Sequence, residues 1–183
     1  MSILITGSAG FIGFSIASDL LKQNKRVIGI DNLNNYYSKK LKNKKINNLK
    51  KSKKFKFIKL DCSSNKFKNY FLKKKISLII HLAAEVGVRN SFYNPYIYYQ
   101  NNLRSFFNVL EICRKNNSNL IFASSSSVYG SSDKSFFKES DNTSSPLSFY
   151  AATKKCNELM AYSYTKNYNF SSIGIRFFNV YGP

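Results

Sequence analysis

The chain has 183 residues, enough for one domain, and its 43% hydrophobic and 16% aromatic residues can form a substantial core. No run of 18 apolar residues occurs, which excludes a membrane-spanning helix at the level of sequence. The 29 Lys and Arg residues outnumber 9 Asp and Glu residues, and the formal net charge of +20 raises the question of nucleic-acid binding.

Short apolar runs alternate along the chain with segments of helical spacing. We predict strands, in chain order, at residues 2–6, 25–31, 55–61, 76–84, 119–130 and 170–182. Helices are predicted at 10–24, in a lysine-rich stretch within 38–59, at 94–117 and at 145–169. The strands are apolar on both faces, as in a parallel sheet covered by helices. The pattern predicts an α/β fold, a Rossmann-like doubly wound parallel sheet, in one domain over residues 1–183.

The stretch at 38–59 is rich in Lys and contains no acid, so it fits either a solvated helix face and loop or a phosphate-binding patch. Most of the excess charge is Lys, and Arg, which reads bases and clamps phosphate bidentately, occurs only five times. Lys, Asn, Ile, Phe and Tyr all have A/T-rich codons, and biased composition explains their abundance more simply. We therefore favour the solvated face and expect no nucleic-acid partner.

The N-terminal stretch "MSILITGSAGFIG" has no basic n-region and no cleavage site, so we expect no signal peptide. The three cysteines, Cys62, Cys113 and Cys156, are odd in number and lack metal-type spacing. They are interpreted as free thiols of a protein in a reducing cytoplasm, without a metal site and without a membrane association.

A glycine-rich turn follows the first predicted strand. "TGSAGFIG" places Gly7, Gly10 and Gly13 between that strand and a helix, where glycines permit a tight turn and let a pyrophosphate approach the helix N-terminus. Asp31 ends the next strand, and a carboxylate there can bind both hydroxyls of an adenosine ribose and repel a 2′-phosphate. The pattern predicts a dinucleotide site that prefers NAD to NADP.

A second motif is "SFYAATKK", in which Tyr150 precedes Lys154 by four residues. Residues so spaced share one face of a helix, and a nearby ammonium is expected to lower the tyrosine pKa. His81, the only histidine, lies within a predicted buried strand and is interpreted as structural.

Four motifs occur together in one order: Gly7-x-x-Gly10-x-x-Gly13, "HLAA" at 81–84, "SSSSVYG" at 124–130, and Tyr150-x-x-x-Lys154. With them the chain resembles, over nearly its whole length, the extended short-chain dehydrogenase/reductase superfamily. Within that superfamily it is most similar to nucleotide-sugar 4-epimerases, and UDP-glucuronate 4-epimerases are nearest. "DNLNNYY", "HLAAEVGVRNS" and "YAATKKCNELMA" carry the nearer similarity.

The resemblance implies a chemistry for three residues. Tyr150 would take the proton of the sugar's C4 hydroxyl, Lys154 would hold the nicotinamide ribose, and Ser125 would hydrogen-bond the 4-hydroxyl. Hydride would pass to NAD and return to the other face of a transient 4-keto sugar, so that NAD is the cofactor and a UDP-sugar the substrate. UDP-glucuronate is the first candidate, for the synthesis of surface polysaccharide precursors.

The resemblance also implies the remaining contacts. The expected cofactor residues are Gly7, Gly10, Phe11, Ile12, Gly13, Asp31, Asn32, Asp61, Cys62, Leu82, Ala83, Ala84 and Asn102, together with Tyr150 and Lys154. The expected substrate residues are Arg89, Ser125, Ser126, Ser127 and Asn179. Asp61 would lie beside the adenine, with a plain strand-end carboxylate as the less favoured alternative. Arg89, in the loop after the fourth strand, could contact a substrate carboxylate or equally have a surface role.

Two departures bear on the reaction. Ser126 and Ser127 stand where related dehydratases and decarboxylases carry acids, which favours epimerisation. Asn179 stands where UDP-glucuronate epimerases usually carry Thr, which leaves UDP-glucose and UDP-N-acetylglucosamine open as substrates.

Because the family continues past "NVYGP", we expect a chain truncated before a C-terminal substrate-binding domain, and a homodimer in full-length form. A catalytically incomplete NAD-binding fragment is the alternative.

Overall fold

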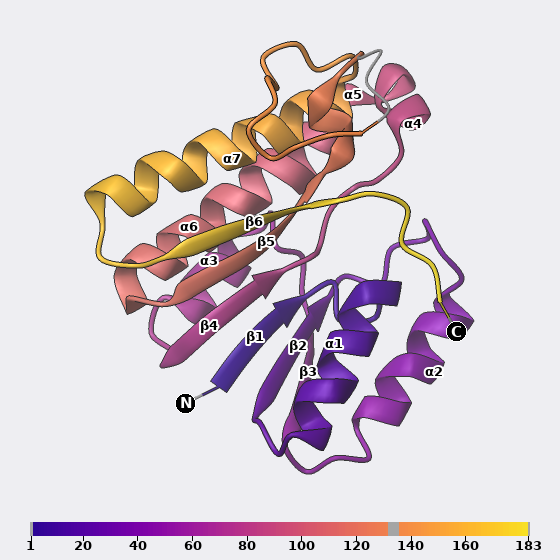
Figure 1. Ribbon diagram of the computed structural model, residues 1–183. Coiled ribbons are helices and arrows are strands. Elements are labelled where there is room, and N and C mark those ends of the chain that lie inside the picture. Colours follow the sequence, from indigo (N-terminus) through magenta and orange to yellow (C-terminus); the bar gives the residue numbers. More distant parts are fainter. Residues whose placement is uncertain (1, 132–135, 183) are drawn as a thin grey trace.

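The computed structural model describes residues 2–131 and 136–182 and contains one six-stranded parallel sheet (Figure 1). Its strands are β1 (Ser2–Thr6), β2 (Val27–Asp31), β3 (Phe55–Lys59), β4 (Ile76–His81), β5 (Asn119–Ser125) and β6 (Ser172–Phe177). They lie in the order β3-β2-β1-β4-β5-β6, with every neighbouring pair parallel. The strand order reverses between β1 and β4, the point at which doubly wound sheets bind ligands. The predicted fold class is confirmed.

The helices connect these strands in chain order. They are α1 (Phe11–Lys22), α2 (Lys39–Leu49), α3 (Asn65–Phe71), α4 (Val88–Tyr93), α5 (Pro95–Tyr98), α6 (Ser105–Asn116) and α7 (Phe149–Asn167), with a π-helical turn η1 (Tyr99–Arg104) and a 3₁₀ turn η2 (Ser126–Tyr129). The predicted continuous helix at 94–117 is therefore three segments. The last three strands end earlier than predicted, and the sequence patterns did not predict α3 or α4.

Two hydrophobic layers hold the sheet. On one face, α1 and α2 bury Ala17 and Leu49 against Ile5, Val27 and Ile80. On the other face, α3, α6 and α7 cover the sheet in a larger cluster. This cluster comprises Leu4, Ile30, Cys62, Phe67, Phe71, Ile76, Ile79, Phe106, Val109, Leu110, Ile112, Cys113, Leu120, Phe122, Ala161 and Phe170. Helices thus cover both faces of the central strands, as the apolar strand sequences predict.

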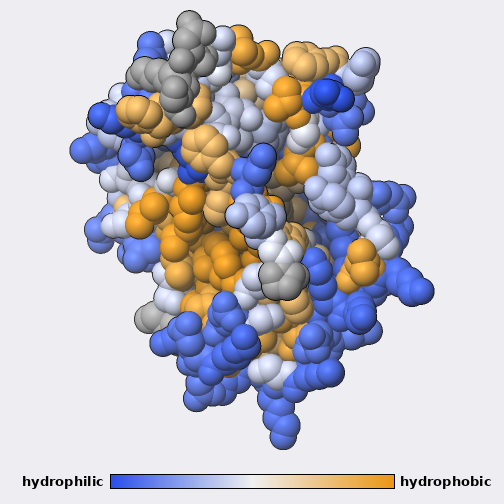
Figure 2. All heavy atoms as spheres, turned by 45° about the vertical axis from the view of Figure 1, so that its right-hand side comes forward, coloured by the Kyte–Doolittle hydropathy of each residue, from blue (hydrophilic) through white to orange (hydrophobic). Residues whose placement is uncertain are grey.

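Strand β6 is less well covered by helices than the central strands. Ile173 and Ile175 are 62% and 40% exposed, and they pair in register with Ile121 and Ala123 of β5. Figure 2 shows apolar side chains gathered over the middle of one face of the molecule, between hydrophilic regions. No helix of the described residues has the length and apolarity needed to cross a bilayer.

The lysine-rich stretch forms α2 and the turn to β3. Lys39, Lys40 and Lys44 of α2 are exposed, which fits a solvated helix face, whereas Lys42 is buried. The Lys42 Nζ donates to Asn34 O and Oδ1 over 3.1 and 2.7 Å. This lysine therefore points inward from an otherwise solvated helix.

Candidate active site

The carboxyl ends of β1, β2, β4 and β5 border one cleft with a cavity volume of about 690 Å³. This size lies within the range of small-molecule sites. Of the predicted cofactor residues, all except Asn102 line the cleft: Gly7, Gly10, Phe11, Ile12, Gly13, Asp31, Asn32, Asp61, Cys62, Leu82, Ala83, Ala84, Tyr150 and Lys154. Ser125 and Asn179 of the predicted substrate residues also line it. Residues distant in sequence thus meet at one sheet edge.

The glycine turn lies where β1 passes into α1. Gly7 has a φ of +71°, a conformation that favours glycine. A Cβ at Gly13 would lie 2.2 Å from the carbonyl oxygen of Gly7, so a side chain there would displace the backbone. Gly10 caps α1 without a side-chain hydrogen bond, and the first turn of this helix contains no acid. The backbone N–H groups at this helix end are therefore available to an anion.

Two carboxylates occupy the neighbouring strand ends. Asp31 is buried and accepts from the backbone N–H groups of Ala9 and Leu33 over 3.2 and 2.9 Å. Asp61 accepts from Asn32 Nδ2 and from the backbone N–H and hydroxyl of Ser63. Burial alone would raise the pKa of the Asp61 carboxyl, but these hydrogen bonds hold the pKa below its usual value. Asp61 therefore remains ionised beside Asn32.

Tyr150 and Lys154 project from the start of α7. Ser148 accepts a hydrogen bond from the Ala151 N–H over 3.1 Å and so caps this helix. The Lys154 Nζ donates to the Ala123 carbonyl of β5 over 2.9 Å and lies 5.9 Å from the centroid of the Tyr150 ring. The predicted shared helix face is therefore present. Burial lowers the pKa of Lys154 to about 8.

The expected lowering of the Tyr150 pKa is wrong for this structure. Burial raises the pKa of Tyr150 above 10.0, with a further contribution from Tyr36, and the hydrogen bond of Ser125 only partly opposes the increase. The Lys154 ammonium donates to the Ala123 carbonyl. Because burial penalises a phenolate strongly, desolvation outweighs the neighbouring hydroxyl.

Asn102 lies behind the cleft wall. Its Oδ1 accepts from the Glu85 N–H over 2.7 Å, and its Nδ2 donates to Glu85 O and to Thr153 Oγ1 over 3.1 and 3.0 Å. The Thr153 hydroxyl donates in turn to the Tyr150 carbonyl over 2.7 Å. Asn102 therefore connects the loop after β4 to the helix that carries Tyr150 and fixes the position of one relative to the other.

His81 is buried at the end of β4, where its Nδ1 lies 2.8 Å from Thr6 Oγ1. Burial, with a contribution from the charge of Lys154, lowers the pKa of His81 to about 3. The imidazole is therefore neutral at ordinary pH and fits the structural interpretation.

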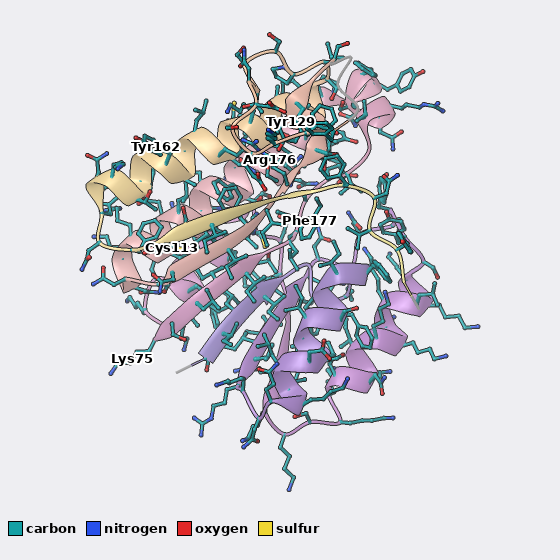
Figure 3. All side chains as sticks on the ribbon, in the orientation of Figure 1. Lys75, Cys113, Tyr129, Tyr162, Arg176 and Phe177 are labelled. Atoms are coloured by element: carbon teal, nitrogen blue, oxygen red, sulfur yellow. The ribbon has the colours of Figure 1, made fainter. Side chains whose placement is uncertain are left out.

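Three predicted substrate residues do not line the cleft. Arg89 belongs to α4 rather than to a loop, and its side chain is exposed. Ser126 and Ser127 begin η2, where the Ser127 N–H donates to Ser125 Oγ over 3.2 Å. Asn179 does line the cleft. The segment after Phe177 runs on past the end of β6 and bends toward α2 (Figure 3).

The sequence patterns missed several residues that line the cleft: Asn34, Tyr36, Tyr37, Lys42, Val86, Gly87, Asn101 and Ser105. Four of them lie between β2 and the first turns of α2, where "DNLNNYY" carries similarity to the epimerases but no motif that predicts contact with a ligand. Within the lysine-rich stretch, no charge pattern distinguishes the buried Lys42 from its exposed neighbours.

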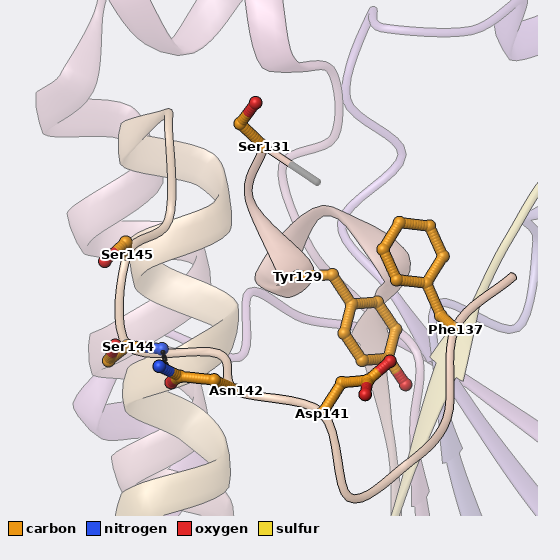
Figure 4. Close-up of a pocket in the computed structure, with 7 residues that line it drawn as sticks. All are labelled: Tyr129, Ser131, Phe137, Asp141, Asn142, Ser144 and Ser145. Carbon is orange, nitrogen blue, oxygen red and sulfur yellow. Dashed lines mark hydrogen bonds between the residues drawn. The ribbon is translucent and has the colours of Figure 1, made fainter. Parts of the chain in front are cut away.

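A smaller hollow of about 250 Å³ lies between the η2 turn and the loop before α7 (Figure 4). The rings of Tyr129 and Phe137 stack there at 4.6 Å, and Arg176 lies 4.9 Å from the Tyr129 ring. None of the residues that line it lines the cleft. In the parts of the chain that the structure describes, no group of three or more His, Cys, Asp or Glu could hold a metal ion.

The fold and the cleft define a dinucleotide-binding protein of the short-chain dehydrogenase type. The chain belongs to the NAD dependent epimerase/dehydratase family, whose profile matches residues 3–183.

Two curated relatives are similar over nearly the whole chain. Protein CapI of Staphylococcus aureus is 47% identical over 185 residues, which cover 100% of this chain and 55% of that protein. The UDP-glucuronate 4-epimerase of Thermodesulfobacterium geofontis is 42% identical over 182 residues, covering 98% and 56%. The chain thus spans about half the length of these relatives.

Among solved structures, the UDP-glucuronic acid 4-epimerase of Bacillus cereus in complex with UDP-glucuronic acid and NAD superimposes with a TM-score of 0.91. It is 34% identical, with 100% of this chain and 58% of that chain covered.

Proposed function

We propose that this chain binds NAD in the cleft and forms the NAD-binding part of a UDP-sugar 4-epimerase, with UDP-glucuronate as substrate. The observation that carries the proposal is the convergence of the glycine turn, Ser125, Tyr150 and Lys154 on one cleft. The family membership and the similarity to the Bacillus cereus epimerase support it. A role in supplying surface polysaccharide precursors rests on the resemblance.

The residues present fit NAD. The turn at Gly7 and Gly13 leaves no room for a Cβ, so the backbone can approach a pyrophosphate, and α1 presents uncapped N–H groups. Asp31 lies one strand away and would receive the adenosine ribose hydroxyls. When bound, NAD supplies a hydride acceptor that returns the hydride to the substrate.

The side chains of this chain would transfer protons and position the substrate. Tyr150 would remove the proton of the C4 hydroxyl and return it in the second half-reaction. Its raised pKa means that a neighbouring positive charge must favour the phenolate, and the Lys154 Nζ, 5.9 Å from the centroid of the Tyr150 ring, is the candidate for that charge. Ser125, whose hydrogen bond opposes the rise of the Tyr150 pKa, would hold the same hydroxyl.

The substrate is the finer part of the proposal. UDP-glucuronate is favoured by the similarity to the epimerases that act on it. Asn179 lines the cleft and differs from the Thr usual in those enzymes, so UDP-glucose and UDP-N-acetylglucosamine are the competing substrates.

The test uses NMR of each sugar nucleotide incubated with NAD and a protein in which this chain is joined to the remaining C-terminal segment of the Thermodesulfobacterium geofontis epimerase. The proposal predicts conversion of UDP-glucuronate to its 4-epimer, and faster conversion than for the two neutral sugars. A protein that folds and binds NAD but epimerises none of the three would refute the proposed reaction. In parallel, we expect negligible epimerisation by the 183-residue chain alone, because we propose that the residues that bind the UDP group lie in the C-terminal segment.

A further inference from the structure

Glu85 is a buried carboxylate that the proposed reaction does not use. It follows β4 in the loop beside the cleft and is only 7% exposed. Its Oε2 accepts from Asn101 Nδ2 over 3.0 Å. In the described part of the chain no lysine or arginine forms an ion pair with it. A carboxylate buried without a cation costs free energy, so its retention suggests a positive partner supplied from outside the chain.

The structure holds this carboxylate firmly in place. The π-helical turn η1 directs two consecutive asparagines at the same residue: Asn101 binds the side chain of Glu85, and Asn102 binds both its N–H and its carbonyl. Such turns are rare and often occur at functional sites. Because Ala84, Val86 and Asn101 line the cleft, Glu85 lies directly behind the cleft wall.

The two phenols that interact with the Glu85 charge, those of Tyr98 and Tyr36, do not neutralise it. Tyr98 donates to the carbonyls of Val86 and Gly87 over 2.8 and 2.7 Å, and its ring lies edge-on to Tyr150 at 6.2 Å. Burial raises the pKa of Tyr98 to about 12, with a contribution from the charge of Glu85. Burial, then Tyr37 and Glu85, also raise the pKa of Tyr36. Both phenols are therefore neutral beside the carboxylate.

We propose that the Glu85 carboxylate is a fixed negative charge that makes the cleft bind oxidised nicotinamide more tightly than reduced nicotinamide. This inference rests on the proposed function, in which the nicotinamide lies at the Tyr150 end of the cleft. The oxidised ring carries one positive charge that the reduced ring lacks, so a buried anion discriminates between them. The Lys154 ammonium lies at the same end and acts in the opposite sense, and Glu85 offsets it.

The test compares dissociation constants for NAD⁺ and NADH, measured by calorimetry and by NADH fluorescence, on the 183-residue chain and on Glu85→Gln. Gln keeps the size and an acceptor for Asn101 but loses the charge. We expect the ratio of the NADH dissociation constant to the NAD⁺ dissociation constant to fall about tenfold, because the variant loses one charge that solvent shields only partly from the nicotinamide ring. Glu85→Met removes the same charge with different packing and should give the same change, so either folded variant decides the question.

Asp19→Asn is the matched control, because Asp19 is an exposed carboxylate on α1 that pairs with Lys22. It should leave the ratio of the two dissociation constants unchanged. An unchanged ratio in a folded Glu85 variant that binds both ligands overturns the inference. A parent chain that binds neither form contradicts the proposed function instead, so the two failures are distinguishable.

Discussion

Lys154 should destabilise the fold at neutral pH, and the effect should disappear as the pH rises. Its pKa is about 8 in the folded chain, against 10.5 for the unperturbed group. The unfolded state therefore binds more protons between these values, and the stability contribution of this group increases with pH through that window. The full difference corresponds to about 3 kcal/mol, of which about 2.5 kcal/mol should appear between pH 7 and pH 10.

The perturbation is Lys154→Met, which removes the charge and leaves the Ala123 carbonyl without its donor. Urea unfolding of both proteins at several pH values gives the free energy of unfolding, and the difference between the proteins cancels the other titrating groups. We expect parent minus variant to rise by about 2–3 kcal/mol from pH 7 to pH 10. A difference that stays flat over this range would show that burial does not lower the Lys154 pKa.

Three further predictions concern the cleft. Asp31→Ala should narrow the preference for NAD over NADP in calorimetric titrations, and equal affinities in the parent would contradict the role of Asp31. Tyr150→Phe, in an enzyme completed with a C-terminal domain, should bind NAD normally but lose on the order of 10²–10⁴ in epimerisation rate. A rate within a few-fold of the parent would exclude Tyr150 as the base. Asn102→Leu leaves the Glu85 N–H without its acceptor and removes the donor to the Glu85 carbonyl and to Thr153 Oγ1, and it should cost about 2–4 kcal/mol in urea unfolding. A cost below about 1 kcal/mol would show that the network is dispensable.

The sheet could be predicted from the sequence because each strand is a short apolar run between turns. The ends of the strands could not be predicted, because the residues of "HLAA" and "SSSSVYG" remain small or apolar beyond the last paired residues of β4 and β5. The long helix opened by Pro95 was predicted as continuous. The π-helical turn inside it depends on tertiary contacts of Asn101 and Asn102, which no local pattern encodes.

The site was predictable to the extent that motifs position it. The glycine turn, Asp31, Ser125, Tyr150 and Lys154 all line the cleft. Burial was the missing quantity elsewhere: it raises the Tyr150 pKa and hides Asn102 behind the wall. The sequence patterns did not indicate Glu85 for the same reason. Its importance depends on its being buried without a cationic partner among the described residues, and no local pattern shows that burial.

A calorimetric titration of NAD into the 183-residue chain and into its Gly13→Ala variant tests whether this cleft binds NAD. A methyl group at Gly13 would lie 2.2 Å from Gly7 O and would displace the turn that is proposed to receive the pyrophosphate. We predict one NAD site in the parent and at least tenfold weaker binding in a Gly13→Ala protein whose circular dichroism shows that it is folded. Equal affinity in the two proteins, or no binding to the folded parent, would contradict the assignment of this cleft to NAD.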